Sequence, residues 1–350
     1  MSEFAARLIA WHKEHGRHDL PWQGTRDAYR IWISEIMLQQ TQVAVVIPYY
    51  QRFIARFPDL ATLAEAPERE VLALWSGLGY YARARNLQRA ARILIGEHGG
   101  RFPRSPREIA RLPGIGRSTA AAIAAFAFGA RAAILDGNVK RVTSRCFGIE
   151  GFPGERQVEK RLWELAEHLM PHKETETYIQ ALMDLGATVC LRHNPACGRC
   201  PVRDLCIAHR DRRVAELPHA RPKRELPQRA TRVLILREGG RVLLEKRPPT
   251  GIWGGLLSLP AVPDEEEDVA AYAAQHLGCT LEEVEALAPI QHGFTHFRLA
   301  LQPLLCPVTA HKPVARQSNH CWLDMAELDG AALPAPIRKL LQRLAEPMLF

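Results

Sequence analysis

The chain has 350 residues, of which 47% are hydrophobic and 24% charged, and its formal net charge is +8. The apolar content excludes a disordered chain, and the length predicts two domains. No apolar run approaches the roughly 20 residues that span a bilayer, and the first residues lack the order of a signal peptide, so we expect no membrane contact and a cytoplasmic location.

The positive charge is concentrated in the first part of the chain. Residues 1–225 contain 34 Lys and Arg against 24 Asp and Glu, whereas residues 226–350 contain 12 against 14. The first part is therefore the better candidate for binding a polyanion. Charge alone leaves a simpler interpretation open, in which the arginines only solvate helices.

Residues 4–207 have the periodicity of α-helices, with apolar residues at three- and four-residue steps. Glu35 lies among apolar residues (IWISEIMLQQTQ) on a segment that we expect to be a buried helix. Burial raises the pKa of a carboxyl group, which makes Glu35 a candidate general acid. The alternative is a surface or salt-bridged glutamate. The amides after it, at Gln39, Gln40 and Gln42, could meet base edges.

Two glycines separate two predicted helices in the segment LPGIGRSTA, residues 112–120. Gly114 and Gly116 predict a tight turn whose free backbone N–H groups face an anion beside a helix N-terminus. Such a turn binds a phosphate without reading sequence. An ordinary connector between two helices is the other interpretation.

Asp136 follows the apolar run AAIL and begins the segment DGNVKR. A carboxylate at the edge of an apolar segment is costly unless it is paired or functional. It could also cap the following helix. Capping and catalysis are compatible, so the two interpretations do not compete.

Four of the eight cysteines lie close together, at Cys190, Cys197, Cys200 and Cys206. Their spacing, C-x6-C-x2-C-x5-C, brings four thiolates within reach of one metal centre. Thiolates select zinc or iron–sulfur clusters, and spacing alone does not decide between them. The other cysteines are scattered, which is typical of a reducing compartment, and there a metal site is favoured over disulfides.

Residues 211–230 contain three prolines and many charges, the composition of a linker. After them come strand patterns such as RVLILRE and GRVLLEKR, with helices predicted near residues 269–277 and 336–344. We therefore predict a helical domain at residues 1–210, a linker at 211–230 and an α+β domain at 231–350.

These motifs together resemble the helix-hairpin-helix DNA glycosylase superfamily, with its hairpin at residues 112–120 and its aspartate at Asp136. The cysteine pattern is similar to that of the branch with a [4Fe–4S] cluster, here in a loop at residues 190–206. Within this branch LPW at 20–22, SEIMLQQTQV at 34–43 and GLGYYARARNL at 77–87 resemble the MutY family of adenine DNA glycosylases. The resemblance covers nearly the whole chain.

The fold that this resemblance implies is a mainly α glycosylase domain followed by an α+β Nudix-like domain. The implied activity is hydrolysis of the N-glycosidic bond of a flipped adenine, mispaired with 8-oxoguanine or guanine, in base excision repair. Glu35 would protonate the adenine, and an ionised Asp136 would stabilise the sugar. Ser118 stands where lyase relatives have a Schiff-base lysine, so a monofunctional enzyme is implied, although Lys140 could trap some product.

The resemblance also implies contacts with double-stranded DNA that contains 8-oxoguanine:adenine or guanine:adenine mispairs, and we expect a monomer. Arg192, Arg199 and Arg203 would lie beside the phosphates. The implied DNA contacts are Gln40, Tyr80, Gly114, Gly116, Ser118, Lys140, Phe294, Thr295 and His296. The implied adenine pocket is Arg17, Trp22 and Gln180, and the implied cluster ligands are Cys190, Cys197, Cys200 and Cys206.

The stretch VLLEKRPPTGIWGGL at residues 242–256 resembles a Nudix domain. A working Nudix hydrolase needs acids along one helix for magnesium, whereas the acids here cluster before the helix, at residues 264–268. We therefore expect a recognition module without pyrophosphatase activity. The family contacts oxidised guanine through a Phe-Ser-His loop, which is Phe294-Thr295-His296 here, and threonine keeps the hydroxyl group.

Three rival functions remain open. A pyrimidine-removing glycosylase with lyase activity is disfavoured by Ser118 and by the C-terminal part. A binding protein with a zinc-stabilised domain does not explain why Glu35 and Asp136 both occupy their positions in the family's motifs. A nucleotide pyrophosphatase lacks its acidic helix.

Overall fold

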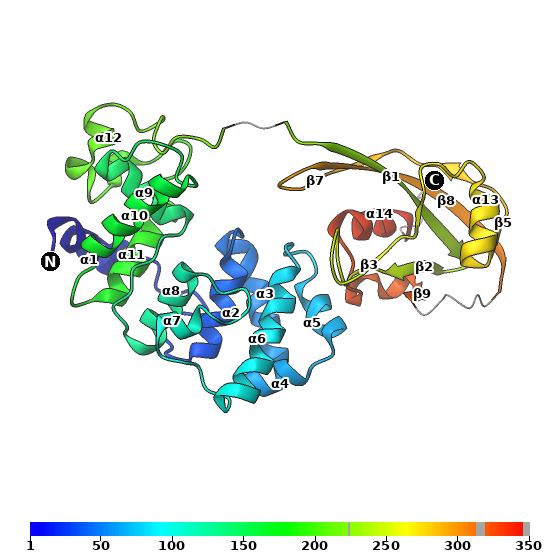
Figure 1. The fold of residues 1–350 in the computed structure, drawn as a ribbon, viewed down its shortest axis with the longest axis horizontal. Helices are drawn as coiled ribbons and strands as arrows, with labels where there is room; N and C mark the ends of the chain where they lie inside the picture. Colours follow the sequence, from blue (N-terminus) through cyan, green and yellow to red (C-terminus); the bar gives the residue numbers. More distant parts are fainter. Residues whose placement is uncertain (223–224, 313–318, 346–350) are drawn as a thin grey trace. The chain divides into compact units, whose positions relative to one another are not determined.

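Figure 1 shows a computed structural model of the chain that describes residues 1–222, 225–312 and 319–345. The chain forms two compact units, one of residues 1–65 and 86–223 and the other of residues 66–85 and 224–350. Residues 66–85 thus group with the C-terminal part, although the sequence places them within the predicted helical domain. The predicted boundaries at 210 and 231 stay a prediction. Among the described residues, no helix is long and apolar enough to cross a membrane.

The first unit is helical, as the periodicity predicts. Its core joins α1 to the four helices α8 to α11, and Leu8, Val142 and Leu185 are fully buried there. The helices are α1 (Glu3–His15), α2 (Ala28–Leu38), α3 (Val43–Arg56), α4 (Leu60–Glu65), α6 (Ala82–His98, which begins in the other unit), α7 (Pro106–Ile109), α8 (Arg117–Phe128), α9 (Gly137–Phe147), α10 (Arg156–Leu169), α11 (Thr175–Thr188) and α12 (Ile207–Arg210).

Side-chain caps fix where the helices of the site begin. The Asp27 carboxylate accepts a hydrogen bond from the backbone N–H of Tyr29 and starts α2 (2.9 Å). Asp136 starts α9 in the same way, through the N–H of Val139 (2.7 Å). A side-chain oxygen at the cap satisfies a donor that the helix itself leaves unpaired. These caps hold the first turns of α2 and α9 in place.

The second unit contains α5 (Glu68–Trp75) and a mixed sheet with strand order β3-β2-β1-β8-β5. β1 and β8 are parallel, from Gln228 beside Arg298 to Arg237 beside Pro307, and the other pairs are antiparallel. The strands are β1 (Gln228–Glu238), β2 (Arg241–Lys246), β3 (Leu257–Ser258), β4 (Ala261–Val262), β5 (Cys279–Leu281), β6 (Glu285–Ala286), β7 (Ile290–Gly293), β8 (Arg298–His311) and β9 (His320–Asp324).

Both faces of the central strand β1 are buried. Val233 and Ile235 pack with Ile337 of α14 (Ala335–Ala345), whereas Leu234 and Leu236 pack on the other face. That second face is covered by α13 (Val269–Tyr272) and the π-helical turn Ala273–Leu277. Successive side chains of a strand point to opposite faces, which explains its continuous apolar run. The two helices predicted for this part are confirmed.

Candidate active site and cysteine loop

A cleft of about 1300 Å³ opens within the first unit. Its walls come from α1, the loop before α2, α2 itself, the starts of α8 and α9, and α11. Segments distant in sequence therefore meet around one space large enough for a nucleobase and its sugar. Nine of the residues singled out from the sequence line it, namely Arg17, Trp22, Glu35, Gln39, Gln40, Gln42, Ser118, Asp136 and Gln180.

Glu35 projects into this cleft from α2, whose Ile33, Ile36 and Met37 are buried in the protein. Burial of the Glu35 carboxyl, together with the negative charge of Asp136, raises its pKa to about 8. A carboxyl group with this pKa is protonated at neutral pH, the state required of a general acid. Glu35 is partly exposed at the cleft, and the pKa shift has the direction that the sequence predicts.

Asp136 faces the same cleft from the first turn of α9. Burial raises its pKa, while hydrogen bonds from the backbone N–H groups of Val139 and Asn138 and the charge of Arg141 act in the opposite direction. The net shift is upward, which differs from the simple expectation of a readily ionised Asp136. Buried acids pay a desolvation cost that the helix N-terminus only partly offsets.

The hairpin between α7 and α8 has the tight turn that its glycines predict. Gly114 has φ +77°, and a Cβ there would lie 2.8 Å from Cβ of Asn86, so the turn requires glycine. Gly116 precedes α8 in an ordinary extended conformation. Ser118 has a clear structural contact: its Oγ accepts a hydrogen bond from the backbone N–H of Leu135, at 3.0 Å. The first turn of α8 is thereby tied to the residue that precedes Asp136.

Two predicted DNA contacts, Gln40 and Tyr80, lie in the left-handed region of backbone conformation, at φ +57° and +49°. Gln40 is an exposed residue at the rim of the cleft. Tyr80 belongs to the other unit, and its side chain is exposed above the guanidinium of Arg83. Non-glycine residues in this strained backbone conformation are common at sites where a protein binds a ligand.

The Lys140 side chain forms an ion pair with α10. Its Nζ lies 2.6 Å from Oε1 of Glu159 on α10, which gives the amine an ion-pair partner of its own. The Lys140 side chain is 22% exposed. A contact with DNA or with a reaction product would therefore have to compete with Glu159.

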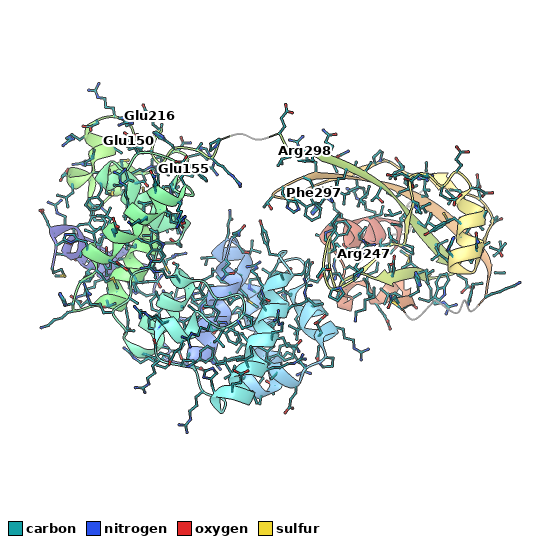
Figure 2. All side chains as sticks on the ribbon, in the orientation of Figure 1. Glu150, Glu155, Glu216, Arg247, Phe297 and Arg298 are labelled. Carbon is teal, nitrogen blue, oxygen red and sulfur yellow. The ribbon has the colours of Figure 1, made fainter. Side chains whose placement is uncertain are left out.

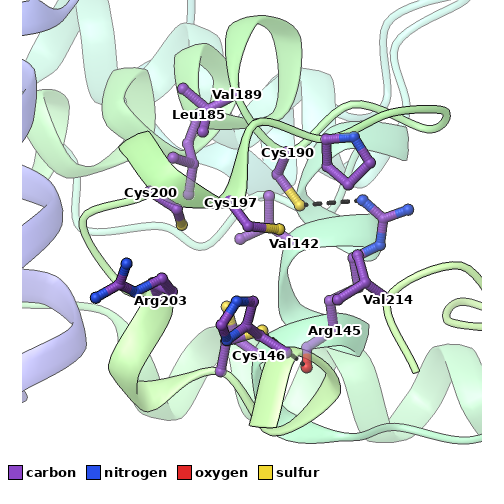
Figure 3. Close-up of a pocket in the computed structure, with 13 residues that line it drawn as sticks. Val142, Arg145, Cys146, Leu185, Val189, Cys190, Cys197, Cys200, Arg203 and Val214 are labelled. Atoms are coloured by element: carbon purple, nitrogen blue, oxygen red, sulfur yellow. Dashed lines mark hydrogen bonds between the residues drawn. The ribbon is translucent and has the colours of Figure 1, made fainter. Parts of the chain in front are cut away.

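The four clustered cysteines line one small pocket, shown in Figure 3. None of them forms a disulfide. Arg145 donates to Sγ of Cys190 at 3.4 Å and to the carbonyl oxygen of Leu191 at 2.6 Å, which holds the start of the loop. The remaining wall is mostly apolar, with Val142, Leu185 and Val189.

The donor set of this pocket fits a metal centre that is bound by thiolates. No three Cys, His, Asp or Glu side chains of the described residues converge closely enough to hold one metal ion. The four thiols line a space together with Cys146, which the sequence pattern sets apart from the cluster. Soft thiolate ligands in an apolar shell are the donor set of iron–sulfur clusters.

The arginines expected beside the phosphates have different surroundings. Arg192 and Arg199 are exposed on the cysteine loop. Arg203 lines the cysteine pocket, and its Nε lies 3.1 Å from Oδ1 of Asp204.

Comparison with known proteins agrees with this geometry. Residues 33–168 match the HhH-GPD superfamily of base excision DNA repair proteins, and residues 232–343 match the NUDIX domain. The adenine DNA glycosylase of Buchnera aphidicola subsp. Baizongia pistaciae is 36% identical over 97% of this chain and 96% of its own length. The human adenine DNA glycosylase is 34% identical over 97% of this chain and 73% of its own length.

The chain belongs to the adenine DNA glycosylase family. It is accordingly a hydrolase of glycosidic bonds that acts on DNA in base excision repair. The structure of a thermostable thymine-DNA glycosylase has the same helical fold, with a TM-score of 0.55 and 34% identity over 59% of this chain and 95% of that chain.

The part of the chain that matches the Nudix domain has the predicted recognition loop between β7 and β8. The ring of Phe294 stacks on Phe297, with centroids 4.5 Å apart, and Figure 2 marks Phe297 just before β8. Thr295 and His296 are exposed beside it, with Thr295 Oγ1 3.4 Å from His296 Nδ1. One aromatic residue thus anchors the loop, and two polar side chains remain accessible.

Sequence reasoning missed Asp184, a buried acid on α11. Its carboxylate accepts hydrogen bonds from two predicted pocket residues, Arg17 and Gln180. The argument applied to Asp136, that an acid within an apolar segment needs a partner or a role, also applies to LMDLG and would have found it.

Proposed function

We propose that this chain removes adenine paired with 8-oxoguanine, or with guanine, from double-stranded DNA and leaves an abasic site. The adenine would be extruded into the cleft, because its glycosidic bond is inaccessible within the stacked duplex. Extrusion costs a few kcal/mol, and less at a mismatch.

The observation that carries this proposal is the presence of Glu35, with a pKa raised to about 8, beside Asp136 in one cleft. Protonated Glu35 would donate its proton to N7 of adenine. The bond between C1′ and N9 then breaks, and its electron pair leaves with the base. A water oxygen bonds to C1′ and returns a proton to the Glu35 carboxylate, so that the acid is restored.

Asp136 would stabilise the positive charge that develops on the sugar. With Glu35 protonated, the pair carries at most one negative charge, and the N–H donors at the start of α9 favour placing it on Asp136. This division of roles resembles that of the two carboxyl groups in glycosidases. Ser118 offers no amine for a Schiff base, which supports hydrolysis without strand cleavage.

The other predicted residues would position the DNA. Gln40 and Tyr80 would enter the duplex, and the Gly114–Gly116 turn would bind a phosphate through backbone N–H groups. In the second unit Thr295 and His296 would recognise the oxidised guanine by hydrogen bonds.

Cys190, Cys197, Cys200 and Cys206 would hold a [4Fe–4S] cluster. When bound, the cluster supplies covalent crosslinks that order the loop, and the loop carries Arg192 and Arg199 to the phosphates.

A strand-scission assay tests the function. The wild-type protein is incubated with duplexes in which adenine is paired with 8-oxoguanine, guanine or thymine, and each sample is divided for treatment with hot alkali. We expect cleavage only after alkali, and only for the first two pairs. Absence of cleavage after alkali would refute glycosylase activity, and full cleavage without alkali would identify a lyase. The His296→Ala variant should reduce the preference for 8-oxoguanine over guanine about tenfold, since it removes a polar contact of roughly 1.4 kcal/mol.

A further inference from the structure

Asp184 lies beneath the wall of the cleft, and its side chain is 1% exposed. Arg17 donates to Oδ1 from Nε and Nη2, at 2.9 and 2.6 Å, and to Oδ2 from its backbone N–H at 2.8 Å. Gln180 Nε2 donates to Oδ1 at 2.9 Å, and His12 Nε2 lies 3.3 Å from Oδ2. Arg17 and Gln180 thus donate to one buried carboxylate, the His12 ring lies beside it, and all three residues line the cleft.

This carboxylate is ionised. Burial acts to raise the pKa of Asp184, but hydrogen bonds from His12 and Arg17 and the positive charge of Arg17 outweigh it and leave the pKa below its usual value. An ionised carboxylate has acceptor oxygens only. It attracts the NH₂ end of a neighbouring amide and repels the carbonyl end.

The orientation of the Gln180 amide follows from this charge. Gln180 lies one helical turn before Asp184 on α11, and its Nε2 is held by the carboxylate. Turning the amide over would bring two oxygens together without a proton between them. Oε1 of Gln180 is therefore the amide atom left for a ligand in the cleft, and among the described residues it accepts no hydrogen bond.

We propose that Asp184 is a positioning residue that makes Gln180 an obligatory hydrogen-bond acceptor, and so selects 6-aminopurines over 6-oxopurines. This rests on the proposed function, in which the cleft receives the flipped base. The exocyclic amino group of adenine donates to Oε1 of Gln180. A 6-oxopurine such as hypoxanthine presents an oxygen at that place, which leaves two acceptors facing each other.

The test compares rates of base removal under single-turnover conditions, from duplexes with adenine or hypoxanthine opposite 8-oxoguanine. The wild-type protein should favour adenine strongly. In Asp184→Asn the neutral amide accepts either end of Gln180, so the side chain can present its NH₂ group to the base. The ratio of the adenine rate to the hypoxanthine rate should then fall at least tenfold. Glu164→Gln, an exposed acid on α10, is the matched control and should leave the ratio unchanged.

Gln180→Leu tests the same proposal without altering Asp184. This variant should lose the discrimination by itself, and adding Asp184→Asn to it should change the ratio no further. The proposal is overturned if Gln180→Leu keeps the wild-type ratio, or if Asp184→Asn slows both bases equally, as a purely structural role requires. Failure of the wild-type protein to remove adenine would instead refute the proposed function.

Discussion

Glu35 on α2 and Asp184 on α11 are both acids withdrawn from solvent at one cleft, yet their pKa values shift in opposite directions. Glu35 has burial and the nearby Asp136 carboxylate acting on it, and its pKa rises to about 8. Asp184 is also buried, but Arg17 and His12 supply enough hydrogen bonds and charge to lower its pKa. Burial alone therefore does not determine the protonation of an acid; its partners do.

The two regions also differ in what they contribute to stability. An acid held neutral in a folded protein destabilises it at a pH where the unfolded chain would be ionised, whereas a well-paired carboxylate stabilises it. Glu35 is thus kept at a cost to stability, which is typical of catalytic groups. Asp184 contributes to stability and orients its neighbours. Replacing each acid should separate these effects.

The largest expected effect is on catalysis. Glu35→Gln keeps the shape of the side chain but has no proton to give to the leaving adenine, so the single-turnover rate of adenine removal should fall about 10³-fold. Binding to the 8-oxoguanine:adenine duplex, measured by fluorescence anisotropy, should change little. A rate within tenfold of the wild type would mean that Glu35 is not the general acid.

Removing Asp184 should affect stability most. Asp184→Ala leaves Arg17 and Gln180 without their acceptor, and we expect a loss of about 3 kcal/mol in the free energy of unfolding. Chemical denaturation at pH 7 measures it, with the exposed Glu164→Ala as the control. A loss below about 0.5 kcal/mol would show that the hydrogen bonds to Asp184 contribute little to stability.

The contributions of Glu35 and Asp184 to stability should change with pH in opposite directions. The folded pKa of Glu35 is about 8, above its unfolded value, so its contribution favours the folded state at low pH and is lost as the pH rises toward 8. The wild type should therefore lose about 2 kcal/mol relative to Glu35→Gln between pH 6 and pH 8. The pKa of Asp184 is lowered in the folded protein. Its contribution to stability is therefore present at neutral pH and is lost as the pH falls through the folded pKa. Parallel stability curves for the wild type and Glu35→Gln would contradict the raised pKa.

Much of this site follows from local sequence pattern. An acid in an apolar helix predicted the raised pKa of Glu35, two glycines predicted the turn at Gly114, and an acid before a helical segment predicted the cap at Asp136. Each of these depends on residues within a few positions of one another. Caps, turns and helix faces are set at that range.

The contacts that were missed join residues far apart in the chain. Arg17 and Asp184 are 167 positions apart, and nothing in either neighbourhood indicates the other. The grouping of residues 66–85 with the C-terminal part was likewise not predicted, because a helical pattern does not say which core a helix joins. Long-range pairing depends on how the helices pack.

The smallest expected effect is that of replacing Ser118, which lies at the cleft near Asp136. The Ser118 hydroxyl accepts a hydrogen bond from the backbone N–H of Leu135, the residue before Asp136. Ser118 therefore positions a neighbouring residue, as Asp184 does. Ser118→Ala leaves that partly buried N–H unpaired and should cost about 1 kcal/mol of stability and a few-fold in rate. Ser118→Thr keeps the hydroxyl and is the matched control. If thermal denaturation and single-turnover rates fail to distinguish the two variants, the hydrogen bond has no role in placing Asp136. An intermediate rate for threonine would show that the added methyl group also matters.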